Sequence, residues 1–151
     1  MRVSARADYA IRALLELAAA GSAPVRAEGI ARAQSIPSKF LENLLVDLRR
    51  SKLVVSQRGA GGGYRLARPA GKVSLAEVIR AVDGPLAGVR DLAPEDVAYE
   101  GAATSLRDVW VALRASMRQV LETTTLADVA QGDLPKSVRK LLKDRDAWSR
   151  R

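Results

Sequence analysis

Apolar residues recur every three to four positions through the first half of the chain, which is the period of amphipathic helices. The pattern predicts four helices, at about residues 4–20, 27–33, 37–50 and 74–82. Ser4 and Ser74 are suitable N-caps, and Pro37 suits the first positions of the third helix. This third helix carries an apolar face made by Phe40, Leu41, Leu44, Leu45 and Leu48.

A glycine-rich hairpin is predicted directly after the third helix. Two short apolar runs, Leu53–Val55 and Tyr64–Leu66, flank a glycine cluster at Gly59, Gly61, Gly62 and Gly63. A phosphate-cradling loop would need a strand before the glycines and a helix after them, and that helix is missing. Arg58 precedes the turn, so the hairpin is basic. A helix followed by a basic, glycine-tipped hairpin is typical of a winged helix-turn-helix domain.

The second half is expected to hold one long helix, over about residues 102–123, after an irregular segment with an acidic cluster. The apolar positions of this helix follow the 3.5-residue repeat of a helix that packs along another helix: Leu106, Trp110, Leu113, Met117 and Val120. The same stripe could pack within the chain. The length of the helix beside a small domain favours a partner chain, and so a homodimer.

These elements divide the chain into four segments. Residues 1–84 are predicted to form the winged helix-turn-helix domain, and residues 85–101 a linker in the place of a sensor loop. Residues 102–130 would form the dimerisation helix with a short closing turn. The basic tail, residues 131–151, has apolar residues at helical spacing and could form a terminal helix, but a frayed, solvated tail is favoured. The predicted fold class is therefore mainly α, with a small two-stranded β wing and a long α-helical dimerisation element.

Positive charge is concentrated where the winged helix is predicted. Residues 1–68 carry twelve Lys and Arg residues against five Asp and Glu residues, whereas residues 69–132 carry six against nine. This asymmetry favours a phosphate-facing half and double-stranded DNA as the partner. With only 4% aromatic residues, the chain has few side chains for stacking on single strands.

The composition also excludes several kinds of chemistry. The chain has no cysteine and no histidine, so disulfides, thiolate metal sites and imidazole general bases are absent. No metal site, no cofactor and no enzyme activity are expected. Asp8, Arg12 and Glu16 interrupt the apolar N-terminal stretch, which argues against a signal peptide, and no membrane span is expected. A cytoplasmic location follows as an expectation.

A series of short residue groups along the chain, taken in order, resembles the Rrf-two (Rrf2) family of bacterial winged-helix regulators. The match runs from residue 1 to about residue 130 and rests on these groups: Asp8-Tyr9-Ala10, Ile36-Pro37, Phe40-Leu41-Glu42, Arg58-Gly59, Gly61-Gly62-Gly63-Tyr64, Ala81-Val82-Asp83-Gly84, Trp110 and Thr125-Leu126. The resemblance implies a homodimeric transcription regulator, with repression favoured, that binds a near-palindromic operator. A non-specific architectural DNA-binding protein remains the alternative, and a measured specificity ratio would separate the two.

The chain departs from the family in its linker. Many members hold an iron–sulfur cluster through cysteines in this loop, whereas residues 88–99 contain no thiol. Where cluster-binding relatives place a histidine, this chain has Arg107 or Asp108. Carboxylates do not replace the soft thiolate ligands of such clusters, so cluster sensing is not carried over to this chain.

Within the DNA-binding interpretation, Ser38 and Lys39 start the recognition helix, and Glu42 could accept a hydrogen bond from a cytosine amino group. Arg58 suits a minor groove or a phosphate. The full candidate set is Arg2, Ser4, Arg6, Tyr9, Ser38, Lys39, Glu42, Asn43, Arg49, Ser56, Arg58, Gly59, Gly61, Gly62, Gly63 and Tyr64. Tyr99 and Trp110 are candidates for an effector pocket, although a seam position in a dimer accounts for Trp110 without any ligand.

Overall fold

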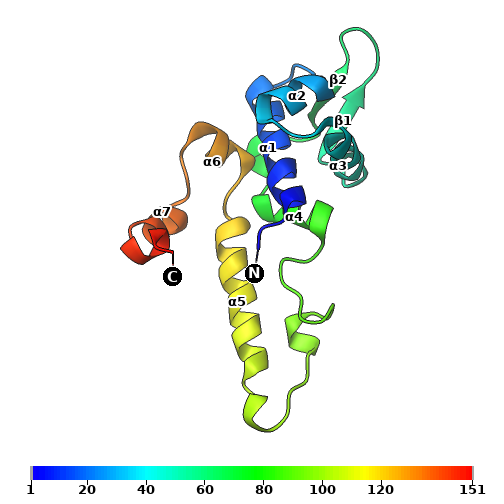
Figure 1. Ribbon diagram of the computed structural model, residues 1–151. Coiled ribbons are helices and arrows are strands. Elements are labelled where there is room, and N and C mark those ends of the chain that lie inside the picture. The colour runs from blue at the N-terminus through cyan, green and yellow to red at the C-terminus, as the bar shows by residue number, and fades with distance from the viewer. Residues whose placement is uncertain (1, 151) are drawn as a thin grey trace.

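The computed structural model describes residues 2–150, in which a helical head carries a long arm (Figure 1). The head contains α1 to α4, the β1–β2 hairpin and α6, and the arm is the segment 85–121, which ends in α5. The helices and strands are α1 Ala5–Ala20, α2 Ala27–Gln34, α3 Ser38–Arg50, β1 Val54–Gln57, β2 Gly63–Leu66, α4 Leu75–Asp83, α5 Leu106–Leu121, α6 Leu126–Gln131 and α7 Lys136–Leu142. Short 3-10 turns lie at Ala70–Lys72, Pro94–Asp96, Gly101–Ala103 and Arg145–Trp148.

The four helices predicted for the head are confirmed. The Ser4 hydroxyl accepts a hydrogen bond from the backbone N–H of Ala7, and Ser74 caps α4 in the same way through Glu77. These bonds satisfy N–H groups that a helix start leaves without an intrahelical partner. Gly21 ends α1 at a φ of 64°, a backbone conformation that glycine adopts without strain.

The core of the head is built around α1, which contacts α2, α3, α4, β2 and α6. α3 inserts one fully apolar face into this core, made by Leu41, Leu44, Leu45 and Leu48. Phe40, expected on the same face, lies at its edge and is half-buried. The opposite face of α3 is therefore left to solvent, beside the hairpin.

The hairpin is the predicted β wing. Val54 pairs with Leu66, and the antiparallel register runs to Gln57 opposite Gly63. β2 also meets the strand-like residue Val25, because the N–H and C=O groups of Val25 and Tyr64 bond each other at 2.8 Å in both directions. The mainly α fold with a two-stranded wing is thus a winged helix-turn-helix.

The arm differs from its prediction at its tip. α5 begins at Leu106 rather than near residue 102, because Gly101–Ala103 form a 3-10 turn. Gly101 has a φ of 58°, outside the α-helical region, and the N–H groups of Ala103 and Thr104 bond carbonyls three residues back, as in a 3-10 turn. Figure 1 shows the loop after α4 running alongside α5, so that the arm is two segments thick.

The expectation of a frayed tail is wrong for much of this segment. Residues 136–142 form α7, and a 3-10 turn follows at Arg145–Trp148. The Trp148 indole N–H donates to the Leu142 carbonyl at 2.9 Å and closes the end of the helix. The tail is nevertheless solvated as predicted, with Leu141 56% and Trp148 72% exposed. Within residues 2–150, no helix combines the length and apolar character that a membrane crossing requires.

Candidate nucleic-acid interface

The solvent face of α3 gathers the predicted DNA-contacting residues of this helix. Ser38, Lys39, Glu42, Asn43 and Arg49 are all exposed, opposite the four buried leucines. The helix presents its N-terminal turn to solvent, where backbone N–H groups and the helix dipole favour a phosphate. One apolar residue, Val46, lies on the same face and is 36% exposed. The apolar periodicity did not single it out, because it falls outside the stripe that the four buried leucines form.

The wing places a second set of predicted residues beside α3. Ser56, Arg58, Gly59 and Gly61 are exposed in or next to the turn between the strands. Gly59 has a φ of 100°, which explains a glycine at that position. The turn is held by a hydrogen bond that the sequence did not reveal, since the Arg26 guanidinium donates to the Ala60 carbonyl at 2.7 Å. The wing loop is thus attached to the start of α2.

Three other predicted residues shape the wing from inside. A Cβ atom on Gly62 would clash with the Gln57 carbonyl oxygen, and one on Gly63 would lie 2.6 Å from the carbonyl of Val25. Neither position has room for a side chain. Tyr64 is half-buried and packs against the core of the head. These residues give the hairpin its shape and leave contact with a ligand to the exposed ones.

Ser4 and Arg6 lie at the junction of three helices. The Arg6 guanidinium contacts Asp47 on α3 at 2.8 Å, approaches Asp83 on α4 at 3.8 Å and donates to the Val82 carbonyl at 3.1 Å. The Ser4 hydroxyl donates to the same Asp83 carboxylate. The polar groups of both side chains are therefore engaged within the head, and they join α1, α3 and α4. Sequence spacing did not reveal these long-range partners.

Tyr9 and Arg2 complete the candidate set. Tyr9 is half-buried, and its ring meets the Phe40 ring edge-on, with centroids 5.4 Å apart. The Arg12 guanidinium lies over the Tyr9 ring at 5.3 Å, a cation–π contact. Tyr9 thus supports the start of α3 from α1. Arg2 precedes α1 and is exposed.

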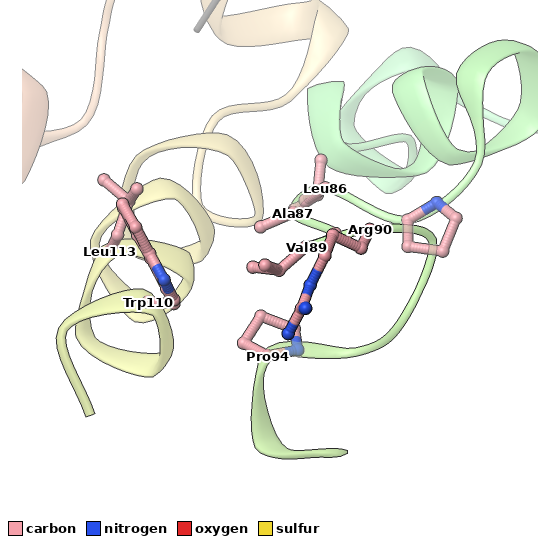
Figure 2. A pocket seen from close by; sticks show the side chains of 9 residues that line it. Leu86, Ala87, Val89, Arg90, Pro94, Trp110 and Leu113 are labelled. Carbon is pink, nitrogen blue, oxygen red and sulfur yellow. The ribbon is translucent and has the colours of Figure 1, made fainter. Parts of the chain in front are cut away.

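The arm contains a pocket of about 460 Å³ at the place expected for an effector site. Figure 2 shows Trp110 and Leu113 of α5 facing Val89, Arg90 and Pro94 of the linker across this pocket. Tyr99 lies outside the lining but holds Trp110, because the indole N–H donates to the Tyr99 hydroxyl at 3.0 Å. The two predicted residues are therefore in contact.

Charged residues support the linker on both sides of this pocket. The Arg90 guanidinium lies over the Tyr99 ring at 5.8 Å. Arg114, whose side chain is 14% exposed, pairs with Glu95 at 2.5 Å. The hydrogen bond from Arg114 lowers the pKa of Glu95 below its ordinary value, with a smaller contribution from a backbone hydrogen bond. These pairs connect segments that are distant in sequence, and periodicity could not predict them.

A recognition-type helix beside a basic wing defines a winged helix-turn-helix DNA-binding protein. The family model for Rrf2, described as an iron-dependent transcriptional regulator, matches residues 3–132. The chain belongs to the Rrf2 family of transcriptional regulators, whose members bind DNA and are not enzymes.

Individual relatives agree with this assignment. Rv1287 of Mycobacterium tuberculosis, named as an HTH-type transcriptional regulator, is 54% identical over 145 residues, covering 95% of this chain and 90% of that protein. The structure of CymR, the global cysteine regulator of B. subtilis, has a TM-score of 0.74 at 30% identity and covers 87% of this chain and 97% of that chain. IscR of T. potens has a TM-score of 0.71 at 32% identity, covering 87% and 88% of the two chains.

Iron dependence, which the family description implies, finds no matching ligands in this chain. The sequence contains neither cysteine nor histidine. Among residues 2–150, no group of three or more carboxylates is placed to hold a metal ion. In the linker, the Glu95 carboxylate is already paired with Arg114. The donor set therefore does not fit an iron–sulfur cluster, which needs soft thiolate ligands.

Proposed function

We propose that the protein is a homodimeric, sequence-specific transcriptional repressor that works in the cytoplasm without an iron–sulfur cluster. The observation that carries the proposal is the polar solvent face of α3, which lies beside a tethered basic wing within residues 1–68, where twelve Lys and Arg residues stand against five Asp and Glu residues. Two such units related by a two-fold axis match a near-palindromic operator.

In this proposal, α3 enters the major groove. Ser38 and Lys39 in its first turn contact the phosphate backbone and hold the helix in register. Glu42 and Asn43 lie one turn further along and meet base edges. The Glu42 carboxylate accepts a hydrogen bond from a cytosine amino group and repels bases that present only acceptors at that point.

The wing supplies an interaction of a different kind. Arg58 stands next to Gly59 and Gly61, which have no side chains to keep the hairpin away from the duplex. It inserts into a narrow minor groove or clamps a phosphate, so its contribution depends on groove shape and on salt. Because Arg26 anchors the turn, little ordering is needed when the wing binds.

A salt titration of variants on operator and scrambled DNA tests this division of labour. Arg58→Ala should reduce the salt dependence of a dimer by about two units of slope, because one phosphate per subunit is no longer neutralised. Glu42→Ala should lower the ratio of operator to scrambled affinity and leave the slope nearly unchanged. Arg107→Ala, an exposed cation at the start of α5, serves as the matched control.

Two results would contradict the proposal. One is an equal loss of affinity on both DNAs for Glu42→Ala. The other is wild-type binding with almost no preference for any sequence, which is the behaviour of an architectural DNA-binding protein.

Dimerisation is proposed through the arm. The predicted seam residues Leu106, Trp110, Leu113, Met117 and Val120 are all half-buried, and α5 contains no fully buried residue. Apolar area thus remains on the helix after the linker, α4 and α7 have packed against it. A second copy of the arm has the same apolar stripe and can cover this area by helix pairing.

The pocket beside Trp110 and Tyr99 is proposed to accept a small effector. In a Trp148→Phe background, Trp110 is the sole tryptophan and reports on its surroundings. The apolar anion 1-anilinonaphthalene-8-sulfonate should quench Trp110 saturably by energy transfer, and Ala87→Phe should abolish this effect by filling the pocket. Trp110 emission that changes with protein concentration instead, with no quenching by the probe, would assign Trp110 to the dimer seam alone.

A further inference from the structure

Val46 is an exposed apolar side chain in the middle of a charged helix face. It is 36% exposed on α3, and its neighbours one turn away on either side are Glu42, Asn43, Arg49 and Arg50, all exposed. Among the described residues of the head, the only other large apolar side chain with such exposure is Val3, which precedes the first helix. Val46 is thus the one apolar group on the surface that α3 presents beside the wing.

The helix geometry directs Val46 toward the residues proposed to read bases. Residues three and four apart share a helix face, so Val46 stands next to Glu42 and Asn43. Side chains on a helix lean toward its N-terminus, which brings the two methyl groups of Val46 over the turn that contains these residues. With α3 in the major groove, these methyl groups face the floor of the groove.

The chemistry of the groove limits what Val46 can recognise there. Valine has no donor or acceptor, so it cannot bond a base edge. The one apolar group that base pairs display in the major groove is the C5-methyl of thymine. We propose that Val46 contacts a thymine methyl group in each half-site and makes the protein specific for a methylated pyrimidine at that position. This inference rests on the proposed sequence-specific binding through α3.

The test begins with selection of an operator from randomised duplexes by the full-length protein. Each thymine of one half-site is then replaced by uracil, which removes only the methyl group, and binding is measured for the wild type and for Val46→Ala. At one thymine the wild type should lose about fourfold in affinity, the value for one buried methyl or methylene group. Val46→Ala should bind the thymine operator more weakly and show no loss on uracil at that position.

Two controls isolate the methyl interaction. Cytosine in place of that thymine should weaken binding of the wild type, and 5-methylcytosine should restore part of the loss. Leu141→Ala, which truncates an exposed apolar side chain on α7, should keep the full thymine preference. Since Val46 is exposed, the thermal unfolding of Val46→Ala should match that of the wild type, which shows that the variant is folded.

The outcomes separate this inference from the function on which it rests. If selection yields no consensus sequence, both the sequence-specific function and the role of Val46 are overturned. If a consensus emerges and depends on Glu42, but no thymine methyl is coupled to Val46, the role of Val46 alone is wrong. Coupling at one thymine of the substituted half-site supports both.

Discussion

The head and the arm bury their apolar residues to very different extents. α1 and α3 each contribute several fully buried side chains to one core, among them Leu14, Leu17, Leu44 and Leu48. In the arm, within the described residues, full burial is confined to Pro94 and Val97 of the linker, and no α5 residue reaches it. Both regions have helices with a clear apolar face, so the difference lies in how many elements surround each helix.

Because of this difference, the stability of the monomer and the proposed dimerisation are expected to depend on different regions of the chain. α1 is covered by five other elements, so its apolar face is removed from water within a single chain. α5 is flanked mainly by the linker, and each of its seam residues stays partly exposed. Because burial of apolar area is the main favourable contribution to folding, the head is expected to supply most of the stability of the monomer. The arm keeps apolar surface exposed, and this is the surface that the proposed dimer would cover.

The strongest test of the comparison is a matched pair of truncations. Leu44→Ala empties a fully buried position in the head and should lower the free energy of unfolding by about 2–5 kcal/mol. Leu113→Ala, at a half-buried arm position, should cost clearly less under conditions in which the protein is monomeric. Denaturant unfolding followed by circular dichroism measures both. Equal losses would mean that head and arm form one core.

Dimerisation, unlike stability, should be more sensitive to substitutions in the arm than to substitutions in the head. Met117→Glu places a charge on the α5 seam and should weaken dimerisation at least tenfold, about 1.4 kcal/mol, because the carboxylate would be desolvated without a partner. Gln119→Glu introduces the same charge on the exposed side of α5 and should leave the dimer intact. Sedimentation velocity over a concentration series reports the result. An unchanged dimer for Met117→Glu would remove the seam from the interface.

The segment that leads from α5 back to the head contains the N-cap of α6. Removing this cap should lower the free energy of unfolding by a smaller amount, and the loss should depend on pH. Thr125 caps α6 by accepting from the Asp128 N–H, and the Asp128 carboxylate accepts from the Thr125 N–H and hydroxyl. Thr125→Ala should cost about 1 kcal/mol at neutral pH, the usual value of an N-cap.

These hydrogen bonds, that from the Thr125 backbone first, lower the pKa of Asp128 below its ordinary value. A carboxyl with a lowered pKa stabilises the fold above its ordinary pKa, and this contribution is lost as the pH falls through the lowered one. The difference between wild type and Thr125→Ala should therefore shrink as the pH falls below the ordinary Asp pKa of about 3.9. Unfolding curves across this range measure it, and a difference that grows in acid would contradict the assignment.

The smallest expected effect is in the arm itself. Glu95→Gln removes the charge that pairs with Arg114 but keeps an acceptor oxygen. Because the Glu95 side chain is 53% exposed, the global unfolding transition should not shift measurably. Hydrogen exchange should become faster only in the linker around Pro94–Val97. A shift as large as that of Leu44→Ala would mean that the linker belongs to the cooperative core.

Periodicity and capping residues were sufficient to predict the four helices and the wing of the head, but not that α6, expected as a closing turn of the dimerisation segment, packs against α1. Ser4 and Ser74 start their helices as expected, and the glycine cluster forms the wing turn, because these signals are local in sequence. The predicted start of α5 was about one helical turn too early. Residues 102–105 are compatible with a helix, and their sequence does not reveal the 3-10 turn that begins at Gly101.

The exposed face of α3 could also be predicted from the sequence, because it is the complement of the apolar face. The partners of Arg6, Arg26 and Arg114 could not. Each of these cations meets a group that is distant in sequence, and only tertiary packing decides which carboxylate or carbonyl is in reach. Val46 was not predicted either, for a different reason, since it falls outside the apolar stripe of α3 and has no donor or acceptor group that would indicate a base contact.

Arg6 fixes the angle between the recognition helix and the base of the arm, through Asp47 on α3 and Asp83 at the end of α4. The C-terminal end of α5 is held to the head as well, because the Leu75 N–H bonds the Thr124 carbonyl at 2.9 Å. In a dimer joined by two arms, the separation and twist of the two α3 helices are then set by rigid packing. Such a dimer would bind only those pairs of half-sites that face the same side of the duplex. Half-sites about one turn apart are in register, and inserting about five base pairs between them turns one half-site to the far side of the duplex. The affinity for an operator would therefore depend on the spacing between its half-sites as well as on the bases inside them.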